Sequence, residues 1–303
     1  MNKIPVGQTI RFAYAFTFGE IGTIIGLIWI PTLINAVAGF FASGVYYRAL
    51  ADSLDSGLPP AGMAATLPFF LAFVSMLLLA MIAVAITQQA LGLRQGPAFA
   101  HVALGGAELR AFGGFFGLYL LLILFVFVLA LIVGAIAIVG ATTAKTNAGA
   151  APMVQAAAGL VLLIGVFALL YVVVRLSFLL VPAVVDGGEF GLTRSWQLTQ
   201  GNFWRIVAVA GATLLPIAVL FGIAELVILG PDFLRPHLPS GNDNTASLHL
   251  MAEQMRTMQA HMPLLMGLSF VISPLLYGLA FAPAAFAYRA LSGGGAVSLR
   301  PNA

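Results

Sequence analysis

The amino-acid sequence predicts an all-α membrane protein with six transmembrane helices, and two observations support this prediction. Of the 303 residues, 61% are hydrophobic and only 8% are charged, whereas a soluble domain has about 25% charged residues. A chain this apolar needs lipid to cover its surface. In addition, six apolar runs are each long enough to cross a hydrocarbon core about 30 Å thick, and none alternates as a barrel strand does.

These runs predict one transmembrane domain at 1–291 and a disordered tail at 292–303. The predicted spans lie near 21–47, 65–91, 114–141, 155–182, 205–229 and 263–288. The segment 230–262, between the fifth and sixth spans, is predicted to be exterior. Prolines lie inside four of the spans, which allows broken helices.

The distribution of basic residues predicts that both termini are cytoplasmic. Nine of the thirteen lysines and arginines fall on the side of the termini, and cytoplasmic loops carry the excess of such residues. These nine are Lys3, Arg11, Arg94, Arg110, Arg175, Arg194, Arg205, Arg289 and Arg300, against Arg48, Lys145, Arg235 and Arg256 on the other side. No basic run occurs, so nucleic acid is not an expected partner.

Short segments of mixed polarity precede the first, third and fifth spans, at 3–20, 97–112 and 187–201. We expect each to form a helix that lies on the cytoplasmic surface of the membrane. This arrangement makes three units of interfacial helix plus helical hairpin. Whether these units are a true repeat stays open, because residue identity between them is low.

Arg175 is unusual because it lies inside an apolar run, about seven residues before the end of the fourth span. At about 1.5 Å per residue, it would lie roughly 10 Å below the interface. Its side chain either extends to the cytoplasmic head groups or faces the helix bundle and binds a lipid phosphate or a carboxylate. Arg175 and nearby Ser177 are therefore candidates for lipid or anion binding.

The residues after the fourth span are explained by an interfacial elbow, a connection that lies on the inner membrane surface. Asp186 and Glu189 have the spacing of an N-cap and its capping-box partner, which predicts the start of a helix. Trp196 lies on the apolar stripe of that helix and is predicted to be buried. The elbow needs no chemistry in this interpretation.

The elbow is predicted to end in a turn that leads into the fifth span. Gly201 suits the position just after a helix, and Asn202 suits the N-cap of the fifth span. Trp204 is expected to anchor that span at the interface.

The residues of this region with a motif-like arrangement are Arg175-x-Ser177, Pro182 and Ser195-Trp196-x-x-Thr199-x-Gly201-Asn202-x-Trp204. They resemble a motif of bacterial six-helix membrane families, which include the membrane domain attached to some glycerophosphodiester phosphodiesterases and related stand-alone integral membrane proteins. The resemblance is strongest over about thirty residues and implies a six-helix fold in the inner membrane of a bacterium. It does not imply phosphodiesterase activity, because only a short tail follows the sixth span.

Glu225 is the only acidic residue well inside an apolar run, about five residues from the outer end of the fifth span. Arg48, at the outer end of the first span, lies at a matching depth. The two could form a structural ion pair, or Glu225 could stay protonated near the interface. The alternative is a carboxylate that couples to a proton or a substrate.

Histidine and methionine residues in the exterior segment raise the question of a copper(I) site, since this soft ion accepts thioether and imidazole ligands. The weak candidates are His249, Met251 and Met255. The methionines also follow the spacing of an amphipathic helix that packs on the bundle or on lipid, and this interpretation is favoured. No cofactor fingerprint occurs, so no cofactor is expected.

The sequence favours a non-enzymatic integral membrane protein, acting in envelope or lipid-related upkeep or as a subunit of a membrane assembly. Its expected partners are the lipid bilayer, phospholipid head groups, and further copies or other members of a membrane complex. A second hypothesis is a small transporter or channel with Glu225 or Arg175 on its pathway. The third hypothesis is a lipid-processing enzyme, and the sequence offers no paired catalytic groups that would support it.

Overall fold

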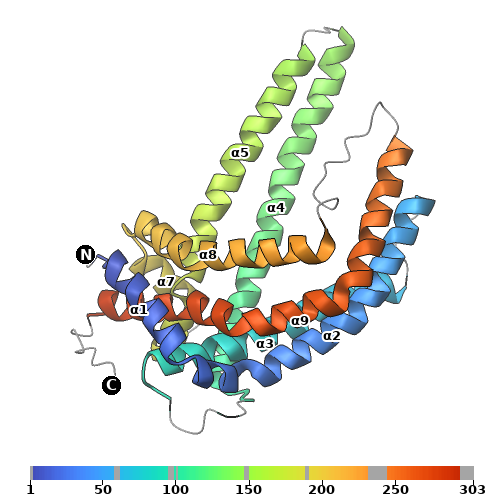
Figure 1. Cartoon of the computed structure of the whole chain (residues 1–303). Coiled ribbons are helices and arrows are strands. Elements are labelled where there is room, and N and C mark those ends of the chain that lie inside the picture. Colours follow the sequence, from blue (N-terminus) through green and yellow to red (C-terminus); the bar gives the residue numbers. More distant parts are fainter. Residues whose placement is uncertain are drawn as a thin grey trace.

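The computed structural model describes residues 3–57, 62–94, 99, 102–146, 150–187, 191–230 and 244–293, with the side chains of 144–146, 150–151 and 244–247 excluded. Within these ranges the regular structure is entirely helical (Figure 1). The helices are α1 (Val6–Gly19), α2 (Ile21–Ser56), α3 (Met63–Ala90), α4 (Gly106–Thr146), α5 (Ala150–Ser177), α6 (Leu180–Gly187), α7 (Leu192–Leu198), α8 (Phe203–Leu229) and α9 (Asn244–Leu291).

Six stretches of these helices are long and apolar enough to cross a membrane, and each overlaps one predicted span. They are Ile21–Ser56, Met63–Ala90, Gly106–Thr143, Pro152–Gly187, Phe203–Leu229 and Leu248–Leu291. The prediction of a multi-pass helical membrane protein is therefore confirmed.

The second half of the segment predicted to be exterior, 230–262, is helical. Residues 244–262 form the first part of α9, which continues without a break into the sixth span. The residues from Leu248 to Met262 contain neither glycine nor proline, so nothing in their backbone chemistry ends the helix. The first half of that segment, 231–243, lies outside the described residues.

The predicted interfacial segments have different outcomes. Residues 3–20 contain α1 and residues 187–201 contain α7, each a separate short helix. The described part of 97–112 contains no separate helix, because α4 already begins at Gly106 and runs directly into the third span. The predicted tail at 292–303 lies outside the described residues except for Ser292 and Gly293.

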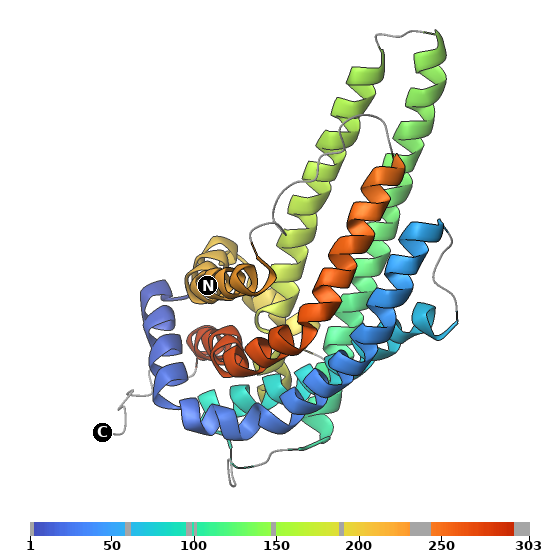
Figure 2. The ribbon, with the colours of Figure 1, turned by 45° about the vertical axis from the view of Figure 1, so that its right-hand side comes forward.

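The packed core joins α2, α3 and α9. Ile24 and Ile28 of α2 pack with Ile82 and Ile86 of α3, and Phe281 of α9 lies against this cluster. Helices α2 and α9 run side by side in both views (Figures 1 and 2). A second cluster seats α6 on α3 and α4, so the short helices close one end of the molecule.

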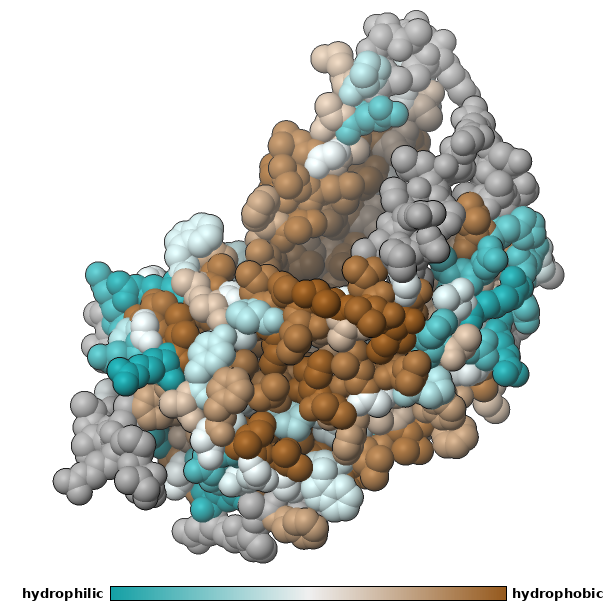
Figure 3. Space-filling view, in the orientation of Figure 1, coloured by the Kyte–Doolittle hydropathy of each residue, from teal (hydrophilic) through white to brown (hydrophobic). Residues whose placement is uncertain are grey.

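The α4–α5 hairpin projects away from this core (Figure 2). Its two helices pack closely on each other where a glycine faces a large side chain, as at Gly165 and Leu129. Over the most apolar stretch of α4 no residue is buried. Brown apolar surface covers much of the hairpin and of the adjoining core (Figure 3). Such a surface is consistent with contact with the lipid bilayer.

Candidate functional site

Arg175, in the last turn of α5, is folded onto α7 and is only 5% exposed. Its Nη2 donates to the carbonyl oxygen of Trp196 at 2.6 Å, and its Nη1 donates to the hydroxyl of Tyr171 at 2.9 Å. The guanidinium also stacks on the Trp196 ring, 3.8 Å from its centroid. Its Nε donates to Thr199 Oγ1 at 3.3 Å. The Arg175 side chain therefore faces the protein and does not extend outward to head groups. Its partners among the described residues are a carbonyl, two hydroxyls and an aromatic ring, and none is a carboxylate.

The hydroxyl of Ser195 explains the break between α5 and α6. It accepts a hydrogen bond from the Leu179 N–H at 3.3 Å and donates one to the Arg175 carbonyl at 2.8 Å. In an uninterrupted helix, that N–H and that carbonyl would bond to each other. The serine thus inserts into the helical ladder and satisfies both groups, which an apolar environment requires. Ser177 closes α5, is half-buried, and makes no hydrogen bond with the described side chains.

Together these contacts form the α5–α7 clasp, which we define as Tyr171, Arg175, Ser195, Trp196 and Thr199. Its members use each other as hydrogen-bond partners. Arg175, Ser195 and Thr199 are buried, whereas Tyr171 is 39% and Trp196 is 36% exposed, so the prediction that Trp196 is buried is wrong. Four of the nine residues of the resemblance motif belong to this clasp: Arg175, Ser195, Trp196 and Thr199. The clasp therefore gives these four motif residues a structural role, and it leaves little surface of Arg175 for a lipid or an anion.

The predicted capping role of Asp186 is wrong. Asp186 lies in the last turn of α6, where its Oδ2 accepts a hydrogen bond from the Tyr288 hydroxyl of α9 at 2.7 Å. Helix α7 instead begins after Gly191, whose φ of +73° is strained for residues with a side chain. A Cβ at Gly191 would also lie 2.7 Å from the Leu180 carbonyl oxygen. Glu189 lies outside the described residues.

At the end of the elbow the residues lie where the sequence predicts, but one of them has a different role. Gly201 follows α7 with a φ of +74°, and Asn202 is the N-cap residue of α8. The Asn202 side chain does not cap that helix, because its Oδ1 accepts a bond from the Ile4 N–H at 3.1 Å. It therefore fastens the N-terminal segment to α8. Trp204 is 78% exposed, as an anchoring residue would be.

The predicted pairing of Glu225 with Arg48 is absent. The Arg48 guanidinium faces Gln259 of α9, whose amide oxygen, when turned toward it, lies 2.6 Å from Nε. Among the described residues Glu225 has no ion pair or hydrogen bond. Helix α9, which is longer than the predicted sixth span, packs along α2 and supplies the neighbour of Arg48.

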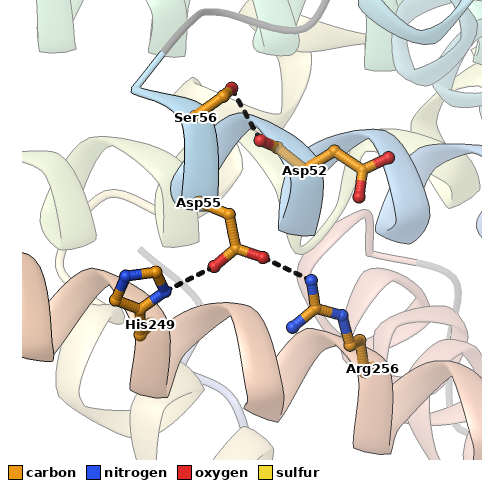
Figure 4. Close-up of polar contacts among 5 residues, drawn as sticks. All are labelled: Asp52, Asp55, Ser56, His249 and Arg256. Atoms are coloured by element: carbon orange, nitrogen blue, oxygen red, sulfur yellow. Dashed lines mark hydrogen bonds and ion pairs between the residues drawn. The ribbon is translucent and has the colours of Figure 1, made fainter.

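The candidate copper residues do not assemble. His249 Nδ1 lies 2.8 Å from Asp55 Oδ1, and Arg256 bonds the other carboxylate oxygen of Asp55 (Figure 4). Met251 is 48% exposed and Met255 is half-buried in the same helix. Within the described ranges no three His, Asp or Glu side chains are grouped as metal ligands. These contacts instead link the C-terminal end of α2 to the N-terminal part of α9.

The sequence analysis missed a cavity of about 320 Å³ between α2, α8 and α9. Its lining is mainly apolar but includes Thr32 and Asn35 of α2 and Tyr277 of α9. Of the described residues that line it, none is charged and none is histidine. A mostly apolar cavity with a few polar groups is the usual form of a small-molecule site.

Only some of the polar groups that line the cavity have hydrogen-bond partners within the protein. Asn35 Oδ1 accepts a hydrogen bond from Ser75 of α3 at 2.6 Å. The Thr32 hydroxyl is buried and has no partner among the described residues, although a helical threonine usually bonds a carbonyl of the preceding turn. The Tyr277 hydroxyl also has no hydrogen-bond partner within the described ranges. The cavity therefore offers hydrogen-bonding groups that the fold does not use.

A proline stands beside the cavity lining in each of its three helices: Pro31, Pro216 and Pro274. Each proline leaves the carbonyl four residues earlier without its helical donor. For Pro216 this is the Ala212 carbonyl, which accepts a bond from the Tyr14 hydroxyl of α1 at 2.8 Å. For Pro274 it is the Phe270 carbonyl, which accepts one from Ser273 at 2.8 Å. The prolines are the sequence signal that could have located the cavity.

A second, larger cavity of about 690 Å³ lies farther along α2 and α9. Arg48, Asp52 and Gln259 give it a polar rim. Between the two cavities, Met266 packs on Gly39, 3.3 Å from where a Cβ would stand. The boundary between α2 and α9 thus holds two cavities with a methionine between them: an outer cavity whose lining includes charged residues, and a mainly apolar inner cavity.

No protein-family model, curated protein or solved structure matches the chain.

Proposed function

We propose that this chain is a non-enzymatic protein of a bacterial inner membrane that holds a small apolar or amphipathic molecule in the cavity between α2, α8 and α9. The single observation that supports this proposal most is the inner cavity, whose lining adjoins three prolines and includes polar groups without a partner in the described structure. In hydrocarbon a polar group without a partner is costly, so a bound molecule that supplies one is favourable.

The chemistry of the lining supports binding and not catalysis. The described lining residues include no Asp, Glu, His, Lys or Arg that could serve as a general acid or base. The hydroxyls of Ser269 and Ser273 donate to helix carbonyls and face no activating base. A lipid-processing enzyme is therefore the least supported of the three hypotheses.

The membrane setting is part of the same proposal. The excess of basic residues on one side supports cytoplasmic termini, with α1 and α7 lying at the inner surface. The resemblance of the 175–205 region supports a bacterial inner membrane, phospholipid neighbours and a role in lipid-related upkeep, alone or within a complex.

Native mass spectrometry of the purified chain tests the proposal. We expect wild-type protein to retain a co-purifying small molecule, and Ala36→Leu or Ala218→Leu to lose it, because both positions line the cavity. Ala208→Leu makes the same change on an exposed face of α8 and should retain it. Equal retention in all four proteins, or in none, would contradict the proposal.

Transport is the second candidate function, and the two cavities along α2 and α9 favour it. Each of the three helices around the inner cavity carries a proline, which leaves one backbone carbonyl without its helical donor. Arg175 and Glu225 lie away from both linings, so this version of the hypothesis does not use them.

A lipid-exchange assay tests this candidate. Vesicles that contain the protein and fluorescent phosphatidylglycerol are treated with an impermeant reductant. Transport predicts faster loss of the inner-leaflet signal than in empty vesicles, and a slower loss with Ala36→Leu. Rates equal to those of empty vesicles would exclude exchange of this lipid.

A further inference from the structure

The polar groups of the inner cavity share one chemical property: each can donate a hydrogen bond. The bond from Ser75 occupies the Asn35 side-chain oxygen, which leaves the amide N–H groups of Asn35 as donors. The Tyr277 hydroxyl is a donor with no partner in the described structure. Thr32 carries a hydroxyl and a methyl group on the same Cβ, so rotation about one bond exchanges their directions. Its buried hydroxyl can thereby turn toward the cavity.

We infer that the inner cavity recognises a carbonyl oxygen of an uncharged, mainly apolar molecule, with Tyr277 and Asn35 as the donors and Thr32 as a third. This inference rests on the proposed function, since it names the class of molecule that the cavity holds. A carbonyl oxygen has two lone pairs and no proton, so it complements a set of donors. No lining residue in the described ranges carries a charge, so an ionised ligand would be buried without a counter-ion.

The position of the cavity narrows the class of molecule further. Thr32 stands eleven residues after the first residue of α2, Ile21, or roughly 16 Å along the helix at about 1.5 Å per residue. Arg48 lies sixteen residues farther along the same helix, or roughly 24 Å. A hydrocarbon core is only about 30 Å thick, so Thr32 lies deep within it. Uncharged, mainly apolar molecules that carry carbonyl groups include quinones and neutral glycerides, and these are the two sources that the test compares.

The test compares compounds with and without carbonyl groups, using the full chain in detergent and native mass spectrometry. The carbonyl probes are decyl-benzoquinone and dioleoylglycerol, and their carbonyl-free counterparts are decylbenzene and dioleyl glyceryl ether. We expect at least one carbonyl probe to bind roughly tenfold more tightly than its counterpart, the effect of about one buried hydrogen bond. The carbonyl probe that binds more tightly shows whether the cavity prefers a quinone or a glyceride.

Two substitutions assign the effect to the cavity. Tyr277→Phe should reduce the preference to about twofold without weakening the carbonyl-free compound, because it removes only a hydroxyl group. Thr32→Val should act in the same direction. Tyr119→Phe makes the same change in α4, away from the cavity, and should leave the preference intact.

The inference is overturned if paired compounds bind equally, if no probe binds, or if Tyr277→Phe leaves the preference unchanged. Its failure is distinguishable from failure of the proposed function. If probes bind without preference and Ala36→Leu abolishes their binding, the cavity holds molecules but does not read their carbonyls. If Ala36→Leu changes neither probe binding nor the co-purifying molecule, the proposed function fails as well.

Discussion

At the scale of single residues, the hydroxyl of Ser195 connects two parts of the chain that are otherwise separate in sequence. It is fully buried and occupies the gap between the Leu179 N–H and the Arg175 carbonyl. The same carbonyl accepts a longer bond from Thr199. The break between α5 and α6 therefore fixes the position of α7, and the guanidinium of Arg175 packs on α7 beside the break.

Ser195→Ala should destabilise the folded protein by about 1–3 kcal/mol, because it leaves a buried N–H without its acceptor and weakens the bonding of a carbonyl. Ser177→Ala is the matched control, with an expected effect within about 0.5 kcal/mol, since Ser177 has no hydrogen bond in the described structure. Thermal unfolding in detergent, followed by size-exclusion chromatography, measures both. Equal effects of the two substitutions would refute the role given to Ser195.

Arg175→Ala should leave the amount of co-purifying phospholipid unchanged while it lowers stability. Arg175 is 5% exposed as a residue, and the observed partners of its guanidinium are groups of the protein. Arg175→Lys should also destabilise, because an ammonium cannot reproduce the planar fork and the stacking on Trp196. Native mass spectrometry measures the lipid. Loss of phospholipid in Arg175→Ala with unchanged stability would restore the lipid-binding interpretation.

These two residues also show what the sequence could and could not predict at this scale. Arg175 was identifiable because a charge inside an apolar run is costly and therefore meaningful. Its partners were not, because Ser195 and Trp196 lie twenty or more residues later and only the fold brings them near. Thr32 and Tyr277 gave no signal, since single uncharged polar residues are common in membrane helices.

At the scale of helices, the prolines and their compensating donors determine how the cavity is built. The pairing of Pro216 with Tyr14 is the clearest case, because it joins α8 to the N-terminal helix α1. The periodicity of the sequence located the spans, since hydropathy reports length and apolarity. It could not locate the ends of α2 and α9, because amphipathic helix continues past the apolar run at both.

A double-mutant cycle tests the compensation at Pro216. Tyr14→Phe should cost about 1–2 kcal/mol, because the Ala212 carbonyl then lacks a donor in an apolar environment. In the Pro216→Ala background, the new backbone N–H can bond that carbonyl, so Tyr14→Phe should cost less than about 0.5 kcal/mol. Unfolding in detergent gives the four stabilities. Equal costs in both backgrounds would mean that the tyrosine hydroxyl does not serve the carbonyl.

At the scale of the whole molecule, the ends of the helices separate into two groups. Helices α1, α6 and α7 and the end of α9 gather at one end, and the end of α2 and the start of α9 lie toward the other (Figures 1 and 2). The contacts of Asp55 with His249 and Arg256 hold this second end together. This separation is what the charge pattern of the sequence leads one to expect of two membrane faces.

Cysteine labelling tests which end faces the cytoplasm, and the chain suits it because it contains no cysteine. Ser56→Cys and Thr193→Cys place single thiols at exposed positions near opposite ends. With cytoplasmic termini, a membrane-impermeant maleimide added to intact cells should label Ser56→Cys and should reach Thr193→Cys only after permeabilisation. Mass spectrometry of the purified chain measures the label. The reverse pattern would invert the topology, and labelling of both thiols in intact cells would show that the two ends do not lie on opposite sides of a membrane.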